Sequence, residues 1–396
     1  MTRTTVYCGD PVQRFGRFSA RDAAGGVPAL FTGRRASFSF NTRVAIRKAC
    51  DLLGLKPGDE VLAPAYNCGS ELDPLLHAGL SILLYPLDRQ ARVDPDAVAA
   101  LIRPKTRAIY VTHYFGFLQP ELTALRRLCD DHGLALIEDC ALSLFSGAQP
   151  AEGRTGDIAV FCFYKFLPVI AGGALVINTA RITGETRFVK PAPAGFVAKR
   201  LIRAGLRAGL GTTATAALSR VLRGRTAAAP DSAPVPAPVP ASRQTDPPDM
   251  PGHYYFAPRL QNTRISSLTA HMLSGFDVAE VSAARRTNYL HLLDRLNAIP
   301  GAAPLFSDLP AEAVPLNMPV VITGPDRNAL VLALQAEGIA ATPWWSGYNR
   351  HLDFSSAPDA RYLKDHLLCL PSHQSLTVAA IDHIAARFHA LIQRGG

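Results

Sequence analysis

The amino-acid sequence predicts an α/β protein: a mostly parallel sheet flanked by helices in a large domain, followed by a smaller C-terminal α/β domain. Between about residues 36 and 180, short apolar segments alternate with segments of helical spacing, the pattern of parallel strands joined by crossover helices. The apolar segments are continuous Val/Ile/Leu runs, typical of strands buried on both faces. A chain of 396 residues with 48% hydrophobic residues can bury enough surface for two domains.

The sequence indicates where the helices and strands of the first half begin and end. From Thr42 to Leu53 the apolar residues follow helical spacing, and the segment stops at Gly54. Further helices are expected at 94–102, after an Asp cap, and at 120–132. The apolar runs expected to form strands are 61–64, 81–85, 108–112, 135–137, 158–163 and 174–177.

Residues 195–225 have a different character. On a helical wheel, Lys199, Arg200 and Arg203 share one arc, and apolar residues take most of the rest. The segment 227–251 that follows contains eight prolines, which predicts an extended linker or surface loop. We therefore divide the chain into a large domain (1–194), an insertion with its linker (195–252) and a small domain (253–396).

The C-terminal third is again mixed α/β. Residues 264–296 are expected to be mainly helical, with Arg285 and Arg286 in a polar stripe. Residues 316–322 predict a strand near an edge of its sheet, because Pro319 has no N–H to give to a ladder. The other expected elements are helices at 326–337 and 377–393 and a strand at 367–370.

Charge and cysteine content narrow the class of protein. Of the formal charge of +9, seven positive charges lie between Lys199 and Arg225, where no acidic residue occurs, so the basicity is local. The seven cysteines are scattered without a CxxC or Cys/His cluster, which predicts neither a zinc site nor disulfides. Without a signal-peptide pattern or a long uncharged apolar stretch, we expect a cytoplasmic protein.

A lysine in an apolar loop is the main candidate catalytic residue. Lys165 is flanked by Phe, Tyr and Leu and precedes a glycine pair at 172–173. About 25 residues upstream, the apolar run 134–137 leads to Glu138 and Asp139. A pyridoxal phosphate (PLP) enzyme needs such a pair, because the amine forms a Schiff base with the cofactor and the carboxylate keeps the pyridine nitrogen protonated.

Other motifs occur in a fixed order along most of residues 36–390, apart from the basic and Pro-rich insertion. They include Gly58-Asp59-Glu60-Val61, Val111-Thr112-His113-Tyr114-Phe115-Gly116, Ile137-Glu138-Asp139-Cys140-Ala141, Asn262-Thr263-Arg264-Ile265 and Leu370-Pro371-Ser372-His373. Together they resemble the DegT/StrS-type (DegT/DnrJ/EryC/StrS) family of PLP-dependent aminotransferases, which has fold type I and acts mostly on keto-sugar nucleotides.

The resemblance assigns roles to Lys165 and to the carboxylates. Lys165 corresponds to the Schiff-base lysine. Asp139 corresponds to the aspartate that pairs with the pyridine nitrogen, with Glu138 as the alternative. Asn262 matches an asparagine that is donated to the partner subunit's phosphate, which implies a homodimer with sites at its interface.

The phosphate of PLP needs backbone N–H groups at a helix start. Asn41, Thr42 and Arg43 open the first expected helix and match the family's phosphate loop by position, although the family usually has Ser-Gly-Thr there. An ordinary helix cap is compatible with the same residues.

Several positions depart from the family pattern. Cys68 stands where the family has an aromatic residue near the pyridine ring, and Leu142 replaces the Gln or His that follows the alanine matched by Ala141. Cys162 replaces the serine before the lysine, and Ala171 replaces a Glu before the paired glycines. Cys68, Ala141 and Cys162 remain expected cofactor contacts. The chain therefore resembles a divergent branch of the family.

Two histidines and three aromatic residues are weaker candidates. His113 and His373 lie in family-like motifs, but a lone histidine at a strand end is more often a structural hydrogen bonder. Tyr66, Trp344 and Trp345 can line a ring-binding pocket, although aromatic residues most often belong to the core.

The leading hypothesis is an aminotransferase that moves an amino group from an amino-acid donor, glutamate by resemblance, to a keto-sugar or related carbonyl acceptor in polysaccharide or natural-product synthesis. The alternatives are other PLP chemistry on the same fold (a dehydratase, lyase or acyl transfer) and a non-catalytic regulatory or nucleic-acid-binding protein. No nucleic-acid-binding motif accompanies the basic segment, so we expect no nucleic-acid partner. The basic amphipathic stretch 195–225 allows peripheral contact with an anionic membrane, or a helix packed on the enzyme body.

Overall fold

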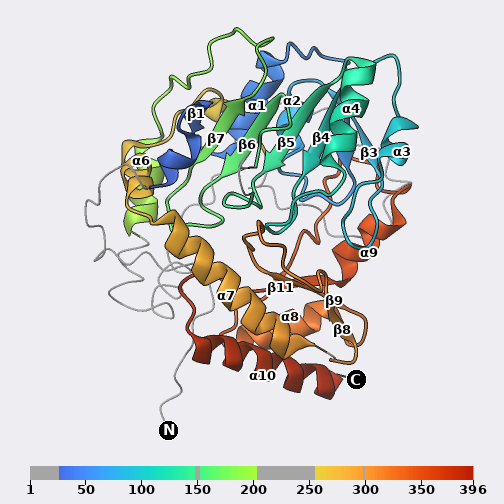
Figure 1. Ribbon diagram of the computed structural model, residues 1–396, viewed down its shortest axis with the longest axis vertical. Helices are drawn as coiled ribbons and strands as arrows, with labels where there is room; N and C mark the ends of the chain where they lie inside the picture. Colours follow the sequence, from blue (N-terminus) through green and yellow to red (C-terminus); the bar gives the residue numbers. More distant parts are fainter. Residues whose placement is uncertain (1–25, 148–151, 203–254, 298, 396) are drawn as a thin grey trace, which may run out of the picture.

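The computed structural model describes residues 26–147, 152–202, 255–297 and 299–395. Within these ranges the chain forms two sheets of unequal size, each with its own helices (Figure 1). The predictions for the Pro-rich segment 227–251 and for most of 195–225 concern residues outside these ranges. None of the helices in the described ranges combines the length and apolar character needed to cross a membrane.

The larger sheet has seven strands in the spatial order β1-β7-β6-β5-β4-β2-β3. Strands β2 to β6 run parallel to one another, whereas β7 pairs antiparallel with both β6 and β1. This confirms the predicted mostly parallel sheet. The strands are β1 (Arg35–Ser39), β2 (Glu60–Pro64), β3 (Ser81–Tyr85), β4 (Thr106–Thr112), β5 (Ala135–Cys140), β6 (Ile158–Cys162) and β7 (Gly173–Ile177).

The helices around this sheet begin and end at residues suited to those positions. The side chains of Asn41 and Asp94 cap helices α1 and α3, and Gly133 ends α4 with a positive φ of 63°. Helix α3 is shorter than predicted, since it ends at Ala99. The helices are α1 (Thr42–Leu52), α2 (Asp73–His77), α3 (Pro95–Ala99), α4 (Leu122–His132) and α6 (Ser267–Ser274).

The smaller sheet has four antiparallel strands in the order β10-β11-β9-β8. Helix α7 (Val278–Leu296) runs from the larger sheet to the smaller one, where it packs against α10 (Val378–Gly395) (Figure 1). The other elements are β8 (Ala302–Pro304), β9 (Met318–Ile322), α8 (Arg327–Ala336), β10 (Thr342–Pro343), α9 (Pro358–His366) and β11 (Leu367–Leu370).

Strand β9 is not at an edge, so the prediction drawn from Pro319 is wrong. β9 lies between β11 and β8. The Pro319 carbonyl accepts from the Leu305 amide (2.9 Å), so the backbone groups of Pro319 face the β8 side, just beyond Pro304, where β8 ends. The missing N–H therefore falls where no ladder bond is needed, and the proline is tolerated in an inner strand.

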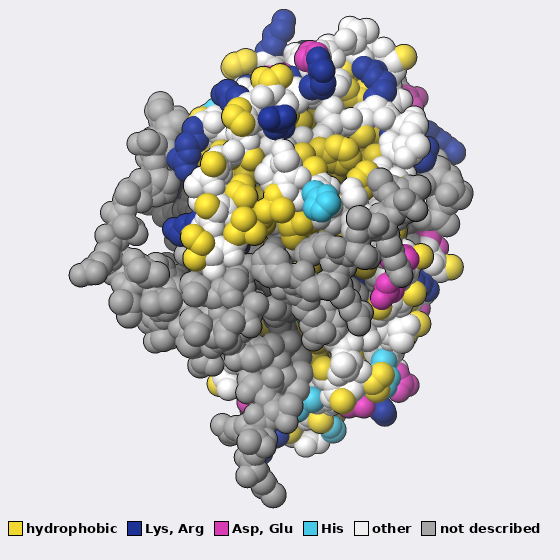
Figure 2. Space-filling view, turned by 90° about the vertical axis from the view of Figure 1, so that its left-hand side faces the viewer, with side chains coloured by type: hydrophobic (Ala, Val, Ile, Leu, Met, Phe, Trp, Pro, Cys, Tyr) yellow, Lys and Arg dark blue, Asp and Glu magenta, His cyan; other side chains and the backbone are white. Residues whose placement is uncertain are grey.

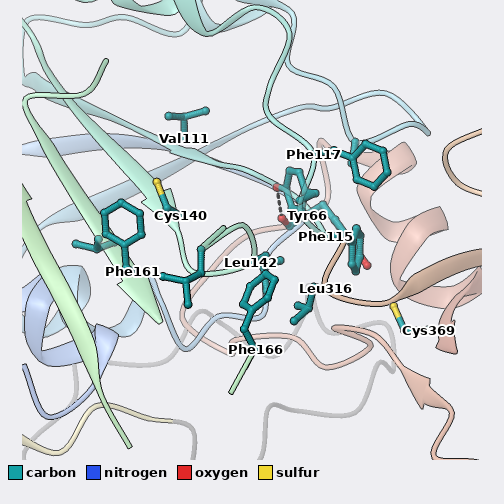
Figure 3. Packing of buried hydrophobic residues seen from close by; sticks show 14 of the residues in the cluster. Tyr66, Val111, Phe115, Phe117, Cys140, Leu142, Phe161, Phe166, Leu316 and Cys369 are labelled. Atoms are coloured by element: carbon teal, nitrogen blue, oxygen red, sulfur yellow. Dashed lines mark hydrogen bonds between the residues drawn. The ribbon is translucent and has the colours of Figure 1, made fainter. Parts of the chain in front are cut away.

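The carboxyl ends of β2, β4, β5 and β6 lie at one edge of the larger sheet, because these strands are parallel. That edge faces the smaller sheet. The Tyr66 hydroxyl donates to the Trp344 carbonyl (3.2 Å), and the Leu316 amide donates to the Phe115 carbonyl (2.8 Å). Figure 3 shows Tyr66, Phe115, Phe166 and Leu316 packed together in this region, which we call the seam.

Candidate active site

Lys165 lies in a tight turn that follows β6. The Phe163 carbonyl accepts hydrogen bonds from the amides of Phe166 (3.2 Å) and Leu167 (2.9 Å). Phe163, Phe166 and Leu167 are buried, whereas Tyr164 is exposed and Lys165 is half-buried. The apolar neighbours therefore anchor the turn while the Lys165 side chain stays partly accessible.

Asp139 lies near the end of β5, the parallel neighbour of β6. Its carboxylate is 3% exposed and accepts hydrogen bonds from the Tyr110 hydroxyl (2.7 Å) and the Ala141 amide (2.8 Å). Burial raises the pKa of Asp139, while the positive charge of Lys165 and the Tyr110 hydrogen bond act against that rise. The fold thus brings Asp139 and Lys165 into one electrostatic environment.

Glu138 points to the opposite side of β5, because successive side chains of a strand alternate. Its carboxylate accepts hydrogen bonds from the amides of Gly153 (3.0 Å), Thr155 (3.1 Å) and Gly156 (2.7 Å), and it lies 3.0 Å from Nε2 of His113. Burial acts to raise the pKa of Glu138, but His113 and the backbone amides outweigh it, so the pKa is lowered. Glu138 is fully engaged in holding the 153–156 loop, which leaves Asp139 as the carboxylate on the Lys165 side.

Three potential metal ligands lie close together on the Glu138 side. Ligand atoms of His113, Cys140 and Glu152 lie within 4.8 Å of one another. The Gln119 amide donates to Nδ1 of His113 (3.0 Å), so the ring proton is on Nε2, which faces Glu138. A protonated ring nitrogen has no lone pair for a metal. This geometry gives His113 a structural role.

The residues at the start of α1 make hydrogen bonds within the chain. The Asn41 side chain accepts from the Val44 amide (3.0 Å), and the Thr42 hydroxyl donates to the Phe161 carbonyl (3.0 Å). Arg43 donates to the Tyr255 carbonyl (3.3 Å). The side chains of Asn41 and Thr42 are therefore already used within the chain. The groups at this helix start that suit an anion are the first backbone N–H groups.

Gly173 allows this helix start to approach β6. A Cβ at Gly173 would lie 2.6 Å from the Phe161 carbonyl oxygen and 2.9 Å from the Thr42 amide nitrogen, too close for any side chain. Cys162, next to Phe161, is fully buried, and burial raises the pKa of its thiol. The positive charge of Lys165 and a hydrogen bond with Thr42 reduce this rise but do not cancel it. The glycine pair noted in the sequence thus brings α1 and the Lys165 turn together.

Glu71 is a buried carboxylate that the sequence reading missed. Its two oxygens accept from the Cys68 amide (2.9 Å) and the Cys68 thiol (2.8 Å). Burial raises the pKa of the Cys68 thiol to about 12, with a further rise from Glu71 and an opposing effect of Lys165. The sequence signal was weak, because Glu71 lies in the connection after β2 (Glu60–Pro64), whereas Asp139 is part of a strand itself.

Aromatic rings from both sides of the seam lie near Lys165. Its Nζ is 5.9 Å from the centroid of the Trp345 ring. That ring lies 5.4 Å from the Tyr66 ring and 5.8 Å from the Tyr114 ring. Aromatic residues are usually part of a core, but Trp345 and Tyr66 lie at the candidate site.

Arg285 was predicted in a polar stripe, and this is wrong, because it is only 1% exposed. Its guanidinium donates to the carbonyls of Pro315 (3.1 Å), Leu316 (2.8 Å) and Phe166 (2.9 Å) and lies over the Phe166 ring. Burial lowers the pKa of Arg285 to about 9. Because Phe166 follows Lys165 directly, α7 supports the lysine turn from the other side of the seam.

Asn262 lies beside the start of α1 of its own chain. The Phe40 amide donates to the Thr263 carbonyl (2.9 Å), which places Asn262 close to the residues that precede α1. Asn262 has a positive φ of 62°, and its carbonyl accepts from the amides of Val189 and Lys190. Its backbone role is therefore clear, whereas its predicted contact with a partner subunit stays a prediction.

Solved structures of other proteins share this fold. Over 94% of the chain it matches an aminotransferase, TlmJ from Streptoalloteichus hindustanus (90% of that chain, TM-score 0.64, 20% identity). It also matches an Escherichia coli GDP-4-keto-6-deoxy-D-mannose-3-dehydratase with bound hydrated PLP, over 91% of this chain and 89% of the other (TM-score 0.63, 18% identity). The fold is therefore that of PLP-dependent transferases of fold type I.

The sequence comparison gives a partial family match. Residues 30–197 match the DegT/DnrJ/EryC1/StrS aminotransferase family. The chain is 29% identical over 152 residues to GDP-perosamine synthase of Vibrio cholerae, which is 38% of this chain and 41% of the relative. It is 35% identical over 140 residues to L-glutamine:2-deoxy-scyllo-inosose aminotransferase of Streptoalloteichus tenebrarius, 34% of this chain and 32% of the relative. The matches thus span less than half the length of these relatives.

Proposed function

We propose that this chain is a PLP-dependent aminotransferase that transfers an amino group from an amino-acid donor, glutamate, to a keto-sugar or related cyclic carbonyl acceptor. One observation carries the proposal: Lys165 and the buried Asp139, which are 26 residues apart in the chain, share one site at the carboxyl edge of the parallel strands. The family match of residues 30–197 and relatives named as sugar or aminocyclitol aminotransferases support it.

The residues of the site fit PLP. Asp139 is a buried carboxylate whose pKa is raised by desolvation, so a cationic ring N–H beside it would relieve the cost of its charge. The first backbone N–H groups of α1, at Thr42 and Arg43, suit a phosphate group. Lys165 acts electrostatically on the thiols of Cys68 and Cys162, and the Ala141 amide donates to Asp139. We propose these three residues as cofactor contacts and Asn262 as a residue that reaches the site of a partner subunit.

PLP, when bound, supplies an electron sink for the carbon that carries the amino group. Lys165 would hold the cofactor through Nζ and, once the donor's amine has displaced it, the free amine would take and return a proton at the substrate. Tyr110 and the Ala141 amide hold the Asp139 carboxylate in place through their hydrogen bonds. Phe163, Phe166 and Leu167 bury the base of the lysine turn and limit its movement.

We propose a homodimer for the assembled enzyme. Figure 2 shows hydrophobic side chains grouped on the face at the β1 and α6 side of the molecule, with Lys and Arg side chains at its border. Such a face is typical of surfaces that pack against another protein. Equilibrium sedimentation measures the mass directly, and a monomer at all concentrations would contradict this part of the proposal.

We propose a cytoplasmic location, because the described cysteines are free thiols, most of them buried. Contact with the inner membrane face is a narrower proposal. Residues 194–202 are helical, with Ile202 62% exposed and Arg200 lying 5.5 Å over the partly exposed Phe196 ring. Flotation with anionic liposomes tests this contact. Deletion of 195–225 should abolish flotation, and unchanged flotation would leave the helix as packing on the enzyme body.

The absorption spectrum tests the proposed function. PLP added to the wild-type protein should give a visible band that L-glutamate bleaches. Lys165→Ala should abolish the band, whereas Lys105→Ala, a surface control, should keep it. A band that does not respond to amino donors would instead favour a dehydratase, lyase or acyl transfer on this fold. A folded protein without any band would contradict the proposal.

A further inference from the structure

Lys364, in α9, is a buried amine outside the proposed PLP contacts. It is 0% exposed, and its Nζ donates to three backbone carbonyls, those of Asn67, Trp345 (3.0 Å) and Gly347 (2.9 Å). An ammonium group has three N–H donors, so all three are used. The rings of Tyr348 (4.9 Å), Phe354 (5.2 Å) and Tyr66 (6.0 Å) also lie near Nζ.

One of these bonds, to Asn67, crosses the seam, and the other two hold the 345–347 turn on the Lys364 side. Asn67 follows β2 in the larger sheet, whereas Trp345 and Gly347 belong to a turn before α9 beside the smaller sheet. Two further bonds join the same segments, from the Tyr66 hydroxyl to the Trp344 carbonyl (3.2 Å) and from the Asn349 side chain to the Gly69 carbonyl (3.3 Å). Lys364 is therefore the charged centre of a contact between residues 66–69 and 344–349.

Trp345 is held in a backbone conformation that costs energy. Its φ is +54°, which a bulky side chain rarely adopts. Such conformations cost about 1–3 kcal/mol and persist only where the surroundings enforce them. The Lys364 bond to the Trp345 carbonyl supplies that restraint, and the ring then lies 5.9 Å from Nζ of Lys165.

We propose that Lys364 is a positioning residue that holds the Trp345 ring beside Lys165, where the ring forms an aromatic wall for a cyclic acceptor. The apolar face of a sugar or cyclitol ring packs well on an aromatic ring, and Tyr66 and Tyr114 extend the same wall. The identity of the acceptor rests on the proposed aminotransferase function. The positioning of Trp345 does not, because it is a property of the protein alone.

The protonation state of Lys364 adds a testable consequence. Burial lowers the pKa of Lys364 to about 8, while Cys68, Glu71 and Asp365 act to raise it. Arg327 of α8 also faces this region, since it donates to the Lys364 carbonyl (2.9 Å). A neutral amine has two N–H groups, so one of the three carbonyls loses its donor as the pH rises through about 8. We therefore expect the Trp345 restraint to weaken above that pH.

The chain has only two tryptophans, Trp344 and Trp345, so tryptophan fluorescence reports on this turn alone. We would titrate Trp344→Phe protein, without cofactor or substrate, from pH 6 to 10. The emission should change with a midpoint near pH 8. Lys364→Met should lose this step and show the high-pH emission throughout. Lys165→Ala should keep the step, because Lys165 does not carry the restraint.

Three results would overturn the proposal: no step in the Trp344→Phe protein, a step that persists in Lys364→Met, or one that disappears in Lys165→Ala. If Lys364→Met does not fold, Lys364→Arg in the Trp344→Phe protein decides, since a guanidinium stays protonated from pH 6 to 10 and the step should be absent. In the active enzyme, Lys364→Met should raise KM for the acceptor about tenfold, the loss of one hydrogen bond to a charged group, with little change in KM for the amino donor. If the fluorescence step is present but KM for the acceptor does not rise, the proposed cyclic acceptor is wrong. The positioning of Trp345 by Lys364 would still stand.

Discussion

The two sides of β5 use neighbouring carboxylates in opposite ways. Glu138 faces the 153–156 loop, where three backbone amides and His113 hold it and lower its pKa. Asp139 faces Lys165, where a hydroxyl and one amide hold it and burial raises its pKa. The same strand therefore carries a carboxylate that is satisfied within the fold and one that still lacks a full set of partners.

This difference separates two kinds of buried charged group, those that stabilise the fold and those that serve a functional site. A group whose hydrogen bonds are complete contributes to stability and has no capacity left for a ligand. A buried charge with fewer partners costs stability and persists at sites that use it. On this argument Asp139 matters for activity and Glu138 for folding, and each can be tested separately.

Asp139→Asn should give the largest effect. Asparagine has nearly the same volume, but it cannot carry the negative charge beside Lys165. We expect kcat with L-glutamate to fall roughly 10²–10⁴-fold, the kinetic equivalent of losing a buried charge pair worth about 3–5 kcal/mol. The free energy of unfolding should not fall, because the buried charge is removed. Near-normal turnover in Asp139→Asn would mean that Asp139 is not the functional carboxylate.

Glu138→Gln is the matched variant on the other side of the strand. An amide nitrogen placed against backbone N–H donors leaves buried groups without partners, which costs about 3 kcal/mol of unfolding free energy. Urea unfolding measures this loss. The kcat of the folded fraction should stay close to that of the wild type. A large fall in kcat without a loss of stability would reverse the assignment of the two carboxylates.

Much of this arrangement is visible in the sequence. Apolar runs that end in Glu138-Asp139 and in Lys165 predict strands whose ends meet at one sheet edge, and the structure confirms those strands. Alternation along β5 then separates the two carboxylates, but it requires knowing which face the lysine turn occupies. That information comes only from the pairing of β5 with β6.

Other features could not be read from the chain. Arg285 and Lys364 are both buried, and their partners are mostly backbone carbonyls from distant segments. Every residue has a carbonyl, so no sequence pattern marks such partners, and a cation in a helix is by default assigned to the surface. The prediction of an edge strand from Pro319 was wrong for a related reason. An inner strand tolerates a proline at this position only because the neighbouring β8 ends there.

The pH dependence of stability should separate the two variants further. The raised pKa of Asp139 means that its charge costs stability above its folded pKa, and that this cost disappears as the pH falls towards its ordinary value of 3.8. The lowered pKa of Glu138 means that its charge stabilises the protein above the ordinary value of 4.5, and that this contribution is lost as the pH falls through its folded pKa.

Relative to the wild type, Asp139→Asn should therefore be more stable at pH 7 and Glu138→Gln less stable, and both differences should shrink on acidification. Urea unfolding at pH 7, 5 and 4 measures them, with an expected gain for Asp139→Asn of about 1 kcal/mol. Differences that stay constant with pH would show that neither effect depends on ionisation.

Tyr110→Phe should give the smallest effect on kcat and the finest test of the comparison. It removes the hydroxyl that donates to Asp139 but leaves the Ala141 amide bond intact. The loss of one hydrogen bond to a charged group, about 1.5 kcal/mol, predicts a roughly tenfold fall in kcat. Tyr85→Phe is the matched control, because Tyr85 is equally buried and its hydroxyl donates to the Tyr110 carbonyl (2.9 Å).

Both tyrosine variants remove one buried hydroxyl, so both should lose a similar, small amount of unfolding free energy, on the order of 1 kcal/mol. Only Tyr110→Phe should also reduce kcat, because only that hydroxyl touches the carboxylate on the Lys165 side. Equal kcat values in the two variants would show that Asp139 does not depend on its donors. The asymmetry between the sides of β5 would then reflect the position of Asp139 and not the strength of its hydrogen bonds.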